Sequence, residues 1–138
     1  MVDRDVVMAK LAVIDRCLGR IAEVRDTRRT NLLPIDVDEI TVLNLQRAIQ
    51  AAIDMATHVV VQEGHHLPDS TAEVFTLLEQ RGVLDRELAG RLRKMAGFRN
   101  IAVHEYQSID PDIVEAIIER HLGDLRLLGA RVVEAFGL

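Results

Sequence analysis

Apolar residues recur along most of the chain at the three- and four-residue spacing of amphipathic helices. Near the N-terminus this spacing is formed by Val7, Leu11, Ile14, Leu18 and Ile21. Side chains spaced in this way share one stripe of a helix and pack against neighbouring helices. The pattern predicts a first helix from about Asp3 to Arg28.

A longer helix is predicted from Asp36 to about Glu63, after a connector from Thr30 to Pro34. Asp36 is the expected N-cap, because Glu39 follows three residues later as in a capping box. The buried stripe of this helix is expected to comprise Val42, Leu45, Ile49, Ala52, Ala56 and Val59. Further apolar residues widen the stripe, namely Ile53, Met55, Val60 and Val61. We therefore expect this helix to be the most buried one.

Start and stop signals divide the second half of the chain into three helices. Ser70 to Glu73 is a capping-box pattern before a short helix that ends at Gly82. Asp85 is expected to cap a fourth helix, and Asp110 followed by Pro111 marks the start of the last one. One continuous stripe is expected in the last helix, at Ile118, His121, Leu125, Leu128, Val132 and Ala135.

These elements indicate an all-α fold, an up-and-down bundle of four to five helices in one domain spanning residues 1–138. The sequence shows no strand-like alternation, and its aromatic content of 3% is low. Apolar residues make up 49% and charged residues 28%, which is an ordinary balance for a folded soluble domain. Leu, Ile, Val and Ala therefore supply most of the expected core.

The composition also limits location and partners. No apolar run approaches the roughly 20 residues that span a bilayer, so no membrane association is expected. Cys17 is the single cysteine, which excludes an internal disulfide and favours a cytoplasmic location. The net charge of −5 argues against general nucleic-acid binding. However, six basic residues between Arg81 and Arg99 face only two acidic ones, which is compatible with a local phosphate-binding groove or simply with a solvated helix face.

Arg99 is predicted to lie in the middle of the apolar stripe of the fourth helix. On an ideal helix, the residues within about 60° of it are Leu88, Leu92, Met95, Ala96, Ala102, Val103 and Tyr106. A guanidinium is costly to bury without a partner. Arg99 should therefore either pair inside the core or face a groove or subunit interface where an anion binds.

His104 follows Arg99 by five residues and Asn100 by four. The wheel places His104 about 140° from Arg99, so the two side chains do not superpose on a straight helix. Either the helix is distorted there, or Arg99 and His104 flank a cleft. A symmetric dimer packed through this face would place two copies of each residue around one groove.

Such a groove suits the cleavage of RNA. A neutral histidine can take the proton of a ribose 2′-hydroxyl, because its ordinary pKa of about 6.5 lies close to working pH. A planar arginine can hold the scissile phosphate and stabilise the charge of its transition state. We expect His104 to act as the acid/base, Arg99 as the phosphate clamp and Asn100 to orient either. The substrate's own hydroxyl is the nucleophile, so no metal and no cofactor are expected.

Arg-x4-His should occur by chance about 0.5 times in a chain of this composition, but adding the only tyrosine, Tyr106, lowers the expectation to roughly 0.004. With Arg99, His104 and Tyr106 in this spacing, the chain resembles the HepT toxins of the HepT–MntA toxin–antitoxin systems, within the HEPN superfamily. The likeness extends over essentially the whole chain in length and helix order. It implies a homodimer with a composite ribonuclease site, and an MntA-like minimal nucleotidyltransferase as antitoxin. It also implies that this antitoxin modifies Tyr106 with AMP.

Other candidates carry weaker expectations. Asn44, Arg47, Asp54 and His58 share a stripe of the second helix, where Arg47 or Asp54 could support the site, although a structural polar network is the simpler interpretation. His65 and His66 are expected to be exposed loop histidines rather than metal ligands. His121 is expected in the core or an interface.

Two other functions stay open at this stage. The bundle could be a non-catalytic subunit that presents substrate to a separate nucleotidyltransferase, with Arg99 and His104 binding a nucleotide. Alternatively, the motif could serve only dimer packing.

Overall fold

The computed structural model describes residues 1–138 and consists of helices joined by short connections. The elements are α1 (Arg4–Arg25), α2 (Pro34–Gln62), α3 (Glu73–Gln80), α4 (Arg86–His104), the 3₁₀-helix η1 (Tyr106–Ser108), α5 (Pro111–Arg120) and α6 (Leu122–Phe136). The prediction of an all-α fold is confirmed. The number of α-helices is six, however, rather than the four to five expected.

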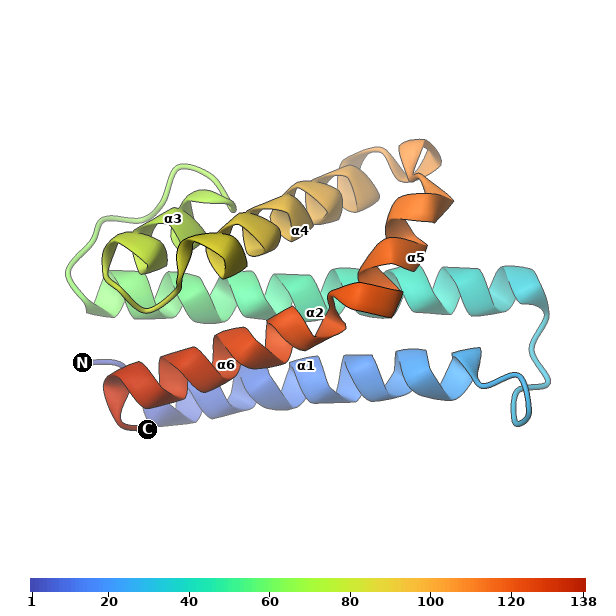
Figure 1. Cartoon of the computed structure of the whole chain (residues 1–138), viewed down its shortest axis with the longest axis horizontal. Coiled ribbons are helices and arrows are strands. Elements are labelled where there is room, and N and C mark those ends of the chain that lie inside the picture. The colour runs from blue at the N-terminus through green and yellow to red at the C-terminus, as the bar shows by residue number, and fades with distance from the viewer.

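The helices α1 and α2 form a long antiparallel hairpin that serves as the base of the bundle (Figure 1). The helix α6 packs along α1, and α3 and α4 pack on α2. The helix α5 crosses between the end of α4 and the start of α6, so α4 and α6 lie on different parts of the hairpin (Figure 1). No helix of the chain combines the length and the apolar character that crossing a bilayer requires.

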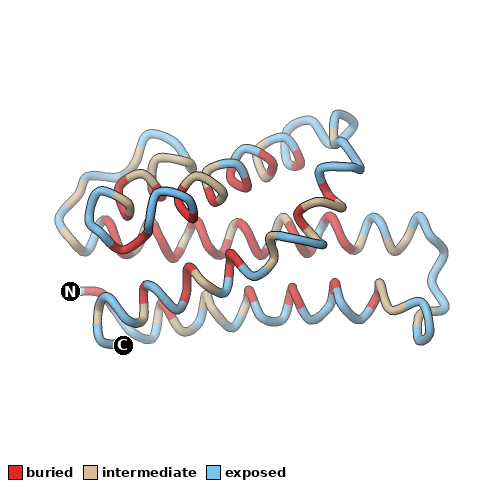
Figure 2. Tube along the Cα trace, in the orientation of Figure 1, coloured by how far each residue is buried: buried red, intermediate tan, exposed pale blue.

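The core lies between these layers, and α2 contributes more of it than any other helix. All six residues of its predicted stripe are buried, as are Ile53, Met55 and Val60. Figure 2 shows buried residues along most of α2 and along the inward faces of α1, α4 and α6. Val61 was expected among the buried residues, but its side chain is 38% exposed. Cys17 is buried, and this burial raises the pKa of its thiol, as suits a small apolar core residue.

The predicted start of α2 is wrong by two residues. The helix begins at Pro34, with Leu33 as an N-cap that makes no side-chain capping bond, and Asp36 lies inside the first turn. Proline is favoured at the first helical position because its fixed φ suits a helix and its missing N–H has no partner there. The acidic Asp36 still interacts favourably with the helix dipole, but it is not the cap.

The last predicted helix is two helices, α5 and α6, with a break at His121. His121 has φ −125° and ψ 0°, which interrupts the helical backbone. Leu125, Leu128 and Val132 are buried as expected, whereas Ala135 is exposed. The break turns the chain so that α6 can run along the hairpin while α5 crosses it (Figure 1).

The helix α4 begins where the sequence predicts. The side chain of Asp85 accepts a hydrogen bond from the backbone N–H of Leu88 at 2.8 Å, which is an N-cap bond. Leu88, Leu92 and Met95 are buried in the core. This anchoring fixes the rotation of α4 and therefore the direction of the side chains in its last turn.

Candidate functional site

Arg99 is half-buried on α4, where Met95, Ala96 and Ala102 on the adjacent turns are buried. Its Nε is buried and has no hydrogen-bond partner. Its Nη1 donates to Oδ1 of Asn100 at 3.1 Å, and no carboxylate lies within ion-pair distance. Of the two sequence-based explanations, pairing inside the core is therefore wrong. A half-buried guanidinium without a carboxylate partner is costly, so Arg99 is suited to bind an anion from outside the protomer.

Asn100 is fixed by two hydrogen bonds, and one of them reaches a residue that the sequence did not indicate. Its Oδ1 accepts from Arg99, and its Nδ2 donates to Oγ1 of Thr71 at 3.1 Å. Thr71 precedes α3, so this bond joins the segment before α3 to the site on α4. The prediction that Asn100 orients one of the other two residues fits its contact with Arg99, whereas no bond joins Asn100 to His104.

His104 is the last residue of α4 and is exposed. The helix is continuous from Arg86 through His104, and no hydrogen bond joins Arg99 to His104 within the chain. Of the two predicted arrangements, the distorted helix is thus not observed. The two side chains leave α4 in different directions, with the half-buried guanidinium and the exposed imidazole on either side of the last turn.

Tyr106 does not lie on α4, where the wheel placed it. The helix ends at His104, Glu105 takes a non-helical backbone conformation, and Tyr106 opens η1. Its side chain is 52% exposed. The phenol is therefore accessible to a modifying enzyme, and only Glu105 separates Tyr106 from His104 along the chain.

Most of the basic excess between Arg81 and Arg99 is neutralised by carboxylates from other elements. Arg81 pairs with Glu63, Arg91 with Asp124, and Arg93 with Glu79. The basic residues of this segment without an ion pair are Arg86, Lys94 and Arg99. The cationic groups left available to a ligand are therefore few.

The residues proposed to support the site from α2 have other partners. Asp54 accepts a hydrogen bond from Gln50 at 2.7 Å and lies 3.5 Å from Nζ of Lys10 on α1. Arg47 is exposed. His58 accepts from the backbone N–H of Asp3 at 3.0 Å. These contacts favour the structural interpretation, because none of them reaches α4.

His66 is exposed, as expected, but it has carboxylate neighbours that the sequence did not indicate. Ligand atoms of His66, Asp69 and Glu73 all lie within 4.8 Å of one another, so the three side chains could hold a divalent cation. Glu73 already accepts a hydrogen bond from the backbone N–H of Asp69 at 2.7 Å. The cluster is exposed and contains none of the motif residues.

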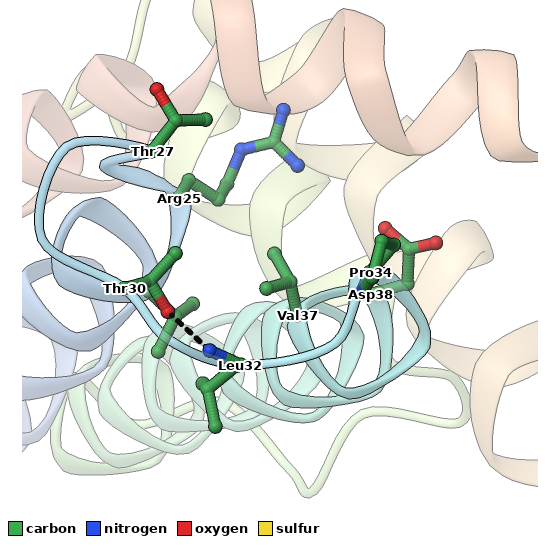
Figure 3. Close-up of a pocket in the computed structure, with 8 residues that line it drawn as sticks. Arg25, Thr27, Thr30, Leu32, Pro34, Val37 and Asp38 are labelled. Carbon is green, nitrogen blue, oxygen red and sulfur yellow. Dashed lines mark hydrogen bonds between the residues drawn. The ribbon is translucent and has the colours of Figure 1, made fainter.

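Another hollow of the surface lies elsewhere, beside the loop that joins α1 to α2. It has a volume of about 430 Å³, and Figure 3 shows Arg25, Thr27, Thr30, Leu32, Pro34, Val37 and Asp38 around it. Arg25 is held from the other side by two hydrogen bonds to Glu115, at 2.7 and 2.8 Å. No motif residue lines this hollow, so we place the candidate site at the end of α4 instead.

The end of α4 presents an arginine without a carboxylate partner, an amide and an exposed histidine on an all-helical bundle. These groups suit a ribonuclease in which the 2′-hydroxyl of the RNA, and no protein side chain, is the nucleophile. Residues 14–131 match the family described as Ribonuclease HepT-like, and the chain belongs to this family of ribonucleases. It is 38% identical over 120 residues to the mRNA nuclease HepT of Shewanella oneidensis, with 87% of this chain and 90% of that protein covered.

Two further comparisons agree with this assignment. The chain is 30% identical over 110 residues to the tRNA nuclease HepT of Aphanizomenon flos-aquae, with 79% of this chain and 75% of that protein covered. Among solved structures it resembles the tri-AMPylated Shewanella oneidensis HEPN toxin in complex with MNT antitoxin. That likeness has a TM-score of 0.84 and 35% identity over 94% of this chain and 98% of that one. The sequence-based resemblance to HepT toxins is thus confirmed.

Proposed function

We propose that this chain is the toxin of a toxin–antitoxin pair and cleaves RNA, as a homodimer, at a site built from Arg99, Asn100 and His104. The observation that carries the proposal is the half-buried guanidinium of Arg99, which bonds only to the neutral Asn100 and has no carboxylate partner within the chain. A phosphate of an RNA backbone supplies the missing negative charge, and the planar guanidinium can bind two oxygens at once. Relatives named as mRNA and tRNA nucleases support RNA as the substrate class.

The chemistry follows from the three side chains. The imidazole of His104 takes the proton of the 2′-hydroxyl, whose oxygen then attacks the adjacent phosphorus. The bond from phosphorus to the 5′-oxygen breaks, and an imidazolium returns a proton to that leaving oxygen. Arg99 binds the phosphate as its negative charge grows, and Asn100 holds the guanidinium in place. The products are a 2′,3′-cyclic phosphate and a 5′-hydroxyl, so DNA should not be cleaved.

A second copy of the chain is expected to complete the groove. Ile101 and Val103, on either side of the motif's last turn, are 43% and 39% exposed although they are apolar. A symmetric interface would cover such side chains and bring two Arg99–His104 pairs together. Because Arg99 and His104 make no bond within the chain, the proposal assigns them to opposite sides of this shared groove.

Tyr106 is proposed as the point of control. One structural relative is an AMPylated toxin bound to its antitoxin, which supports a nucleotidyltransferase of the MntA type as partner. The Tyr106 oxygen would attack the α-phosphorus of ATP, with pyrophosphate as the leaving group and loss of the phenolic proton. The bound AMP is bulky and negatively charged, so two residues from His104 it would exclude an RNA phosphate.

The test is cleavage of labelled RNA by purified protein in EDTA, with mass spectrometry confirming that Tyr106 carries no AMP. We expect cleavage by the wild type, with 2′,3′-cyclic phosphate ends, and loss of at least about 100-fold in His104→Ala and Arg99→Ala. His66→Ala and Arg86→Ala are matched controls, since both residues are exposed and lie outside the motif. Circular dichroism must show that all four variants are folded.

Intact RNA with the wild type, across a broad panel of substrates, would contradict the proposal. Expression without the partner gives an independent measurement. A toxin arrests growth, whereas a non-catalytic subunit that only presents substrate to a nucleotidyltransferase does not.

A further inference from the structure

A second hollow lies between α4 and α5, away from the motif residues. Its volume is about 370 Å³. The apolar residues that line it are Met95, Phe98, Ile113, Ala116 and Ile117. Ile113 is 50% exposed although it is a large aliphatic residue, so nothing in the chain covers this surface. A flat apolar ligand group of modest size would find a matching floor here.

Three cationic or potentially cationic side chains stand around the apolar floor, namely Arg91, Lys94 and His121. Lys94 is exposed and has no ion-pair partner. Asp124 is buried and accepts from Nε of Arg91 at 2.9 Å, and its Oδ2 lies 3.2 Å from Nδ1 of His121. The Asp124 carboxylate thus contacts Arg91 through Nε and His121 through Nδ1. The terminal nitrogens of Arg91 and Nε2 of His121 make no bond within the chain.

An apolar floor with cations around it is complementary to a nucleotide, which joins a flat base to a phosphate. The position of the hollow relative to the motif identifies the source of that nucleotide. Lys94 and His104 lie on the same helix, ten residues apart, which corresponds to about 15 Å along its axis. A single strand of RNA covers that distance in two to three nucleotides, at roughly 6 Å for each.

The surface of α4 between the two places is open to a strand. Gly97 lies there, exposed, and a Cβ added to it would meet no neighbouring atom within 4 Å. A strand held at His104 can therefore pass over Gly97 as it follows α4 towards its N-terminus.

We propose that the hollow between α4 and α5 is a binding subsite for a nucleotide of the RNA substrate, two to three positions from the scissile phosphate. The base lies on Phe98 and Ile113, and the phosphate binds Lys94 and the free end of Arg91. This proposal rests on the proposed ribonuclease function. The subsite makes the enzyme favour single-stranded RNA, because a paired base cannot enter the hollow.

The test measures binding apart from cleavage. A His104→Ala protein is titrated with a fluorescent single-stranded RNA of eight nucleotides, by anisotropy, over a range of salt concentrations. Adding Lys94→Glu should weaken binding about tenfold and lower the slope of log affinity against log salt by about 0.7, the contribution of one phosphate contact in a single strand. The matched control adds Arg86→Glu, which makes the same change of charge type on an exposed residue of α4 outside the hollow.

A second variant, Ala116→Phe, fills the hollow without changing the charge. It should weaken binding severalfold but leave the salt slope unchanged, with Ala22→Phe on the exposed face of α1 as its control. A 4-thiouridine placed at the second or third position from the cleavage site should cross-link to a peptide of α4 or α5.

Several results would overturn the subsite. One is equal affinity in Lys94→Glu and Arg86→Glu. Another is that AMP binds at the hollow while RNA affinity is unchanged by both pocket variants, which would mean a free-nucleotide site. A third is dissociation of the homodimer by either pocket variant in sedimentation, which would mean that a second copy covers the hollow. Failure of the proposed function is distinguishable, because it appears as intact RNA with the wild type whatever these titrations show.

Discussion

At the scale of single residues, Arg99 has the least satisfied environment of the site. It is half-buried on an apolar arc, yet its side chain bonds only to the neutral Asn100 and one of its nitrogens is a buried free donor. Stability alone does not account for such a residue, because an apolar side chain of similar size would avoid the unmet hydrogen bond. Anion binding accounts for it, since a bound phosphate supplies the negative charge that the chain itself does not place beside the guanidinium.

Replacing Arg99 by lysine tests whether shape or only charge matters. Lysine keeps the charge but lacks the planar group that binds two oxygens at once and that is held in place by its hydrogen bond to Asn100. We expect Arg99→Lys to lower kcat/KM for RNA by about 100-fold or more, with thermal unfolding close to that of the wild type. Steady-state cleavage assays measure this, and a loss of only a fewfold would show that a point charge is sufficient.

Thr71 is expected to act as a positioning residue, through Asn100. In Thr71→Val the Nδ2 group of Asn100 loses its acceptor, and the amide is free to turn away from Arg99. We expect kcat to fall by about tenfold while KM changes little, because the contact orients Arg99 rather than binding RNA. Thr71→Ser keeps the hydroxyl and should restore activity; if it is as impaired as Thr71→Val, the role is in packing.

Arg99 and His104 could be proposed from the sequence because helix geometry relates residues that are close in the chain. Thr71 was missed because its bond to Asn100 joins positions 29 apart, and a local pattern such as Ser70 to Glu73 carries no information about such contacts. Tyr106 was assigned to the correct segment but the wrong element. Its position depends on Glu105, whose backbone is not helical, so that α4 ends at His104 and does not reach Tyr106.

At the scale of elements, a helix start was predicted correctly where a single residue near it caps the helix with its own side chain. Asp85 and Asp110 each cap a helix with a side-chain bond, at 2.8 and 2.9 Å, and both starts were predicted. The start of α2 was misplaced because the segment contains two residues that are typical of a helix start, Pro34 at the first helical position and Asp36 as a possible N-cap. The helix begins at the proline. The helical stripe continues in phase from Ile118 to Leu125, so the break at His121 leaves no trace in the apolar pattern.

The orientation of α4 depends on its cap. Removing the carboxylate in Asp85→Ala leaves the backbone N–H of Leu88 without its partner. We expect the free energy of unfolding to fall by about 1 kcal/mol, which urea denaturation at constant m-value would measure. Glu87→Ala is the control, since Glu87 is exposed in the same first turn and makes no capping bond, and it should cost only a few tenths of a kcal/mol. Equal losses in the two variants would show that the helix dipole, not the cap, is responsible.

At the scale of the whole molecule, we expect a second copy of the chain to complete the proposed site. The guanidinium of Arg99 and the imidazole of His104 leave α4 on different sides and do not bond to each other. Exposed apolar residues flank them, as expected of a surface that a second copy covers. Sequence could predict both residues but not this arrangement, because whether two groups act within a subunit or across two is a property of the assembly.

Mixed dimers decide between those two arrangements. Arg99→Ala and His104→Ala proteins are each inactive as homodimers, but a mixed dimer has one intact arginine and one intact histidine on opposite subunits. If the groups act across the interface, that dimer keeps one intact Arg99–His104 pair of the two in the shared groove. Unfolding and refolding an equimolar mixture makes about half of the dimers mixed, so we expect about a quarter of the wild-type activity to return. If Arg99 and His104 act within one subunit, both sites of the mixed dimer lack a group and the mixture stays as inactive as its components. Wild-type protein unfolded and refolded alone is the control, because it measures how much activity refolding preserves.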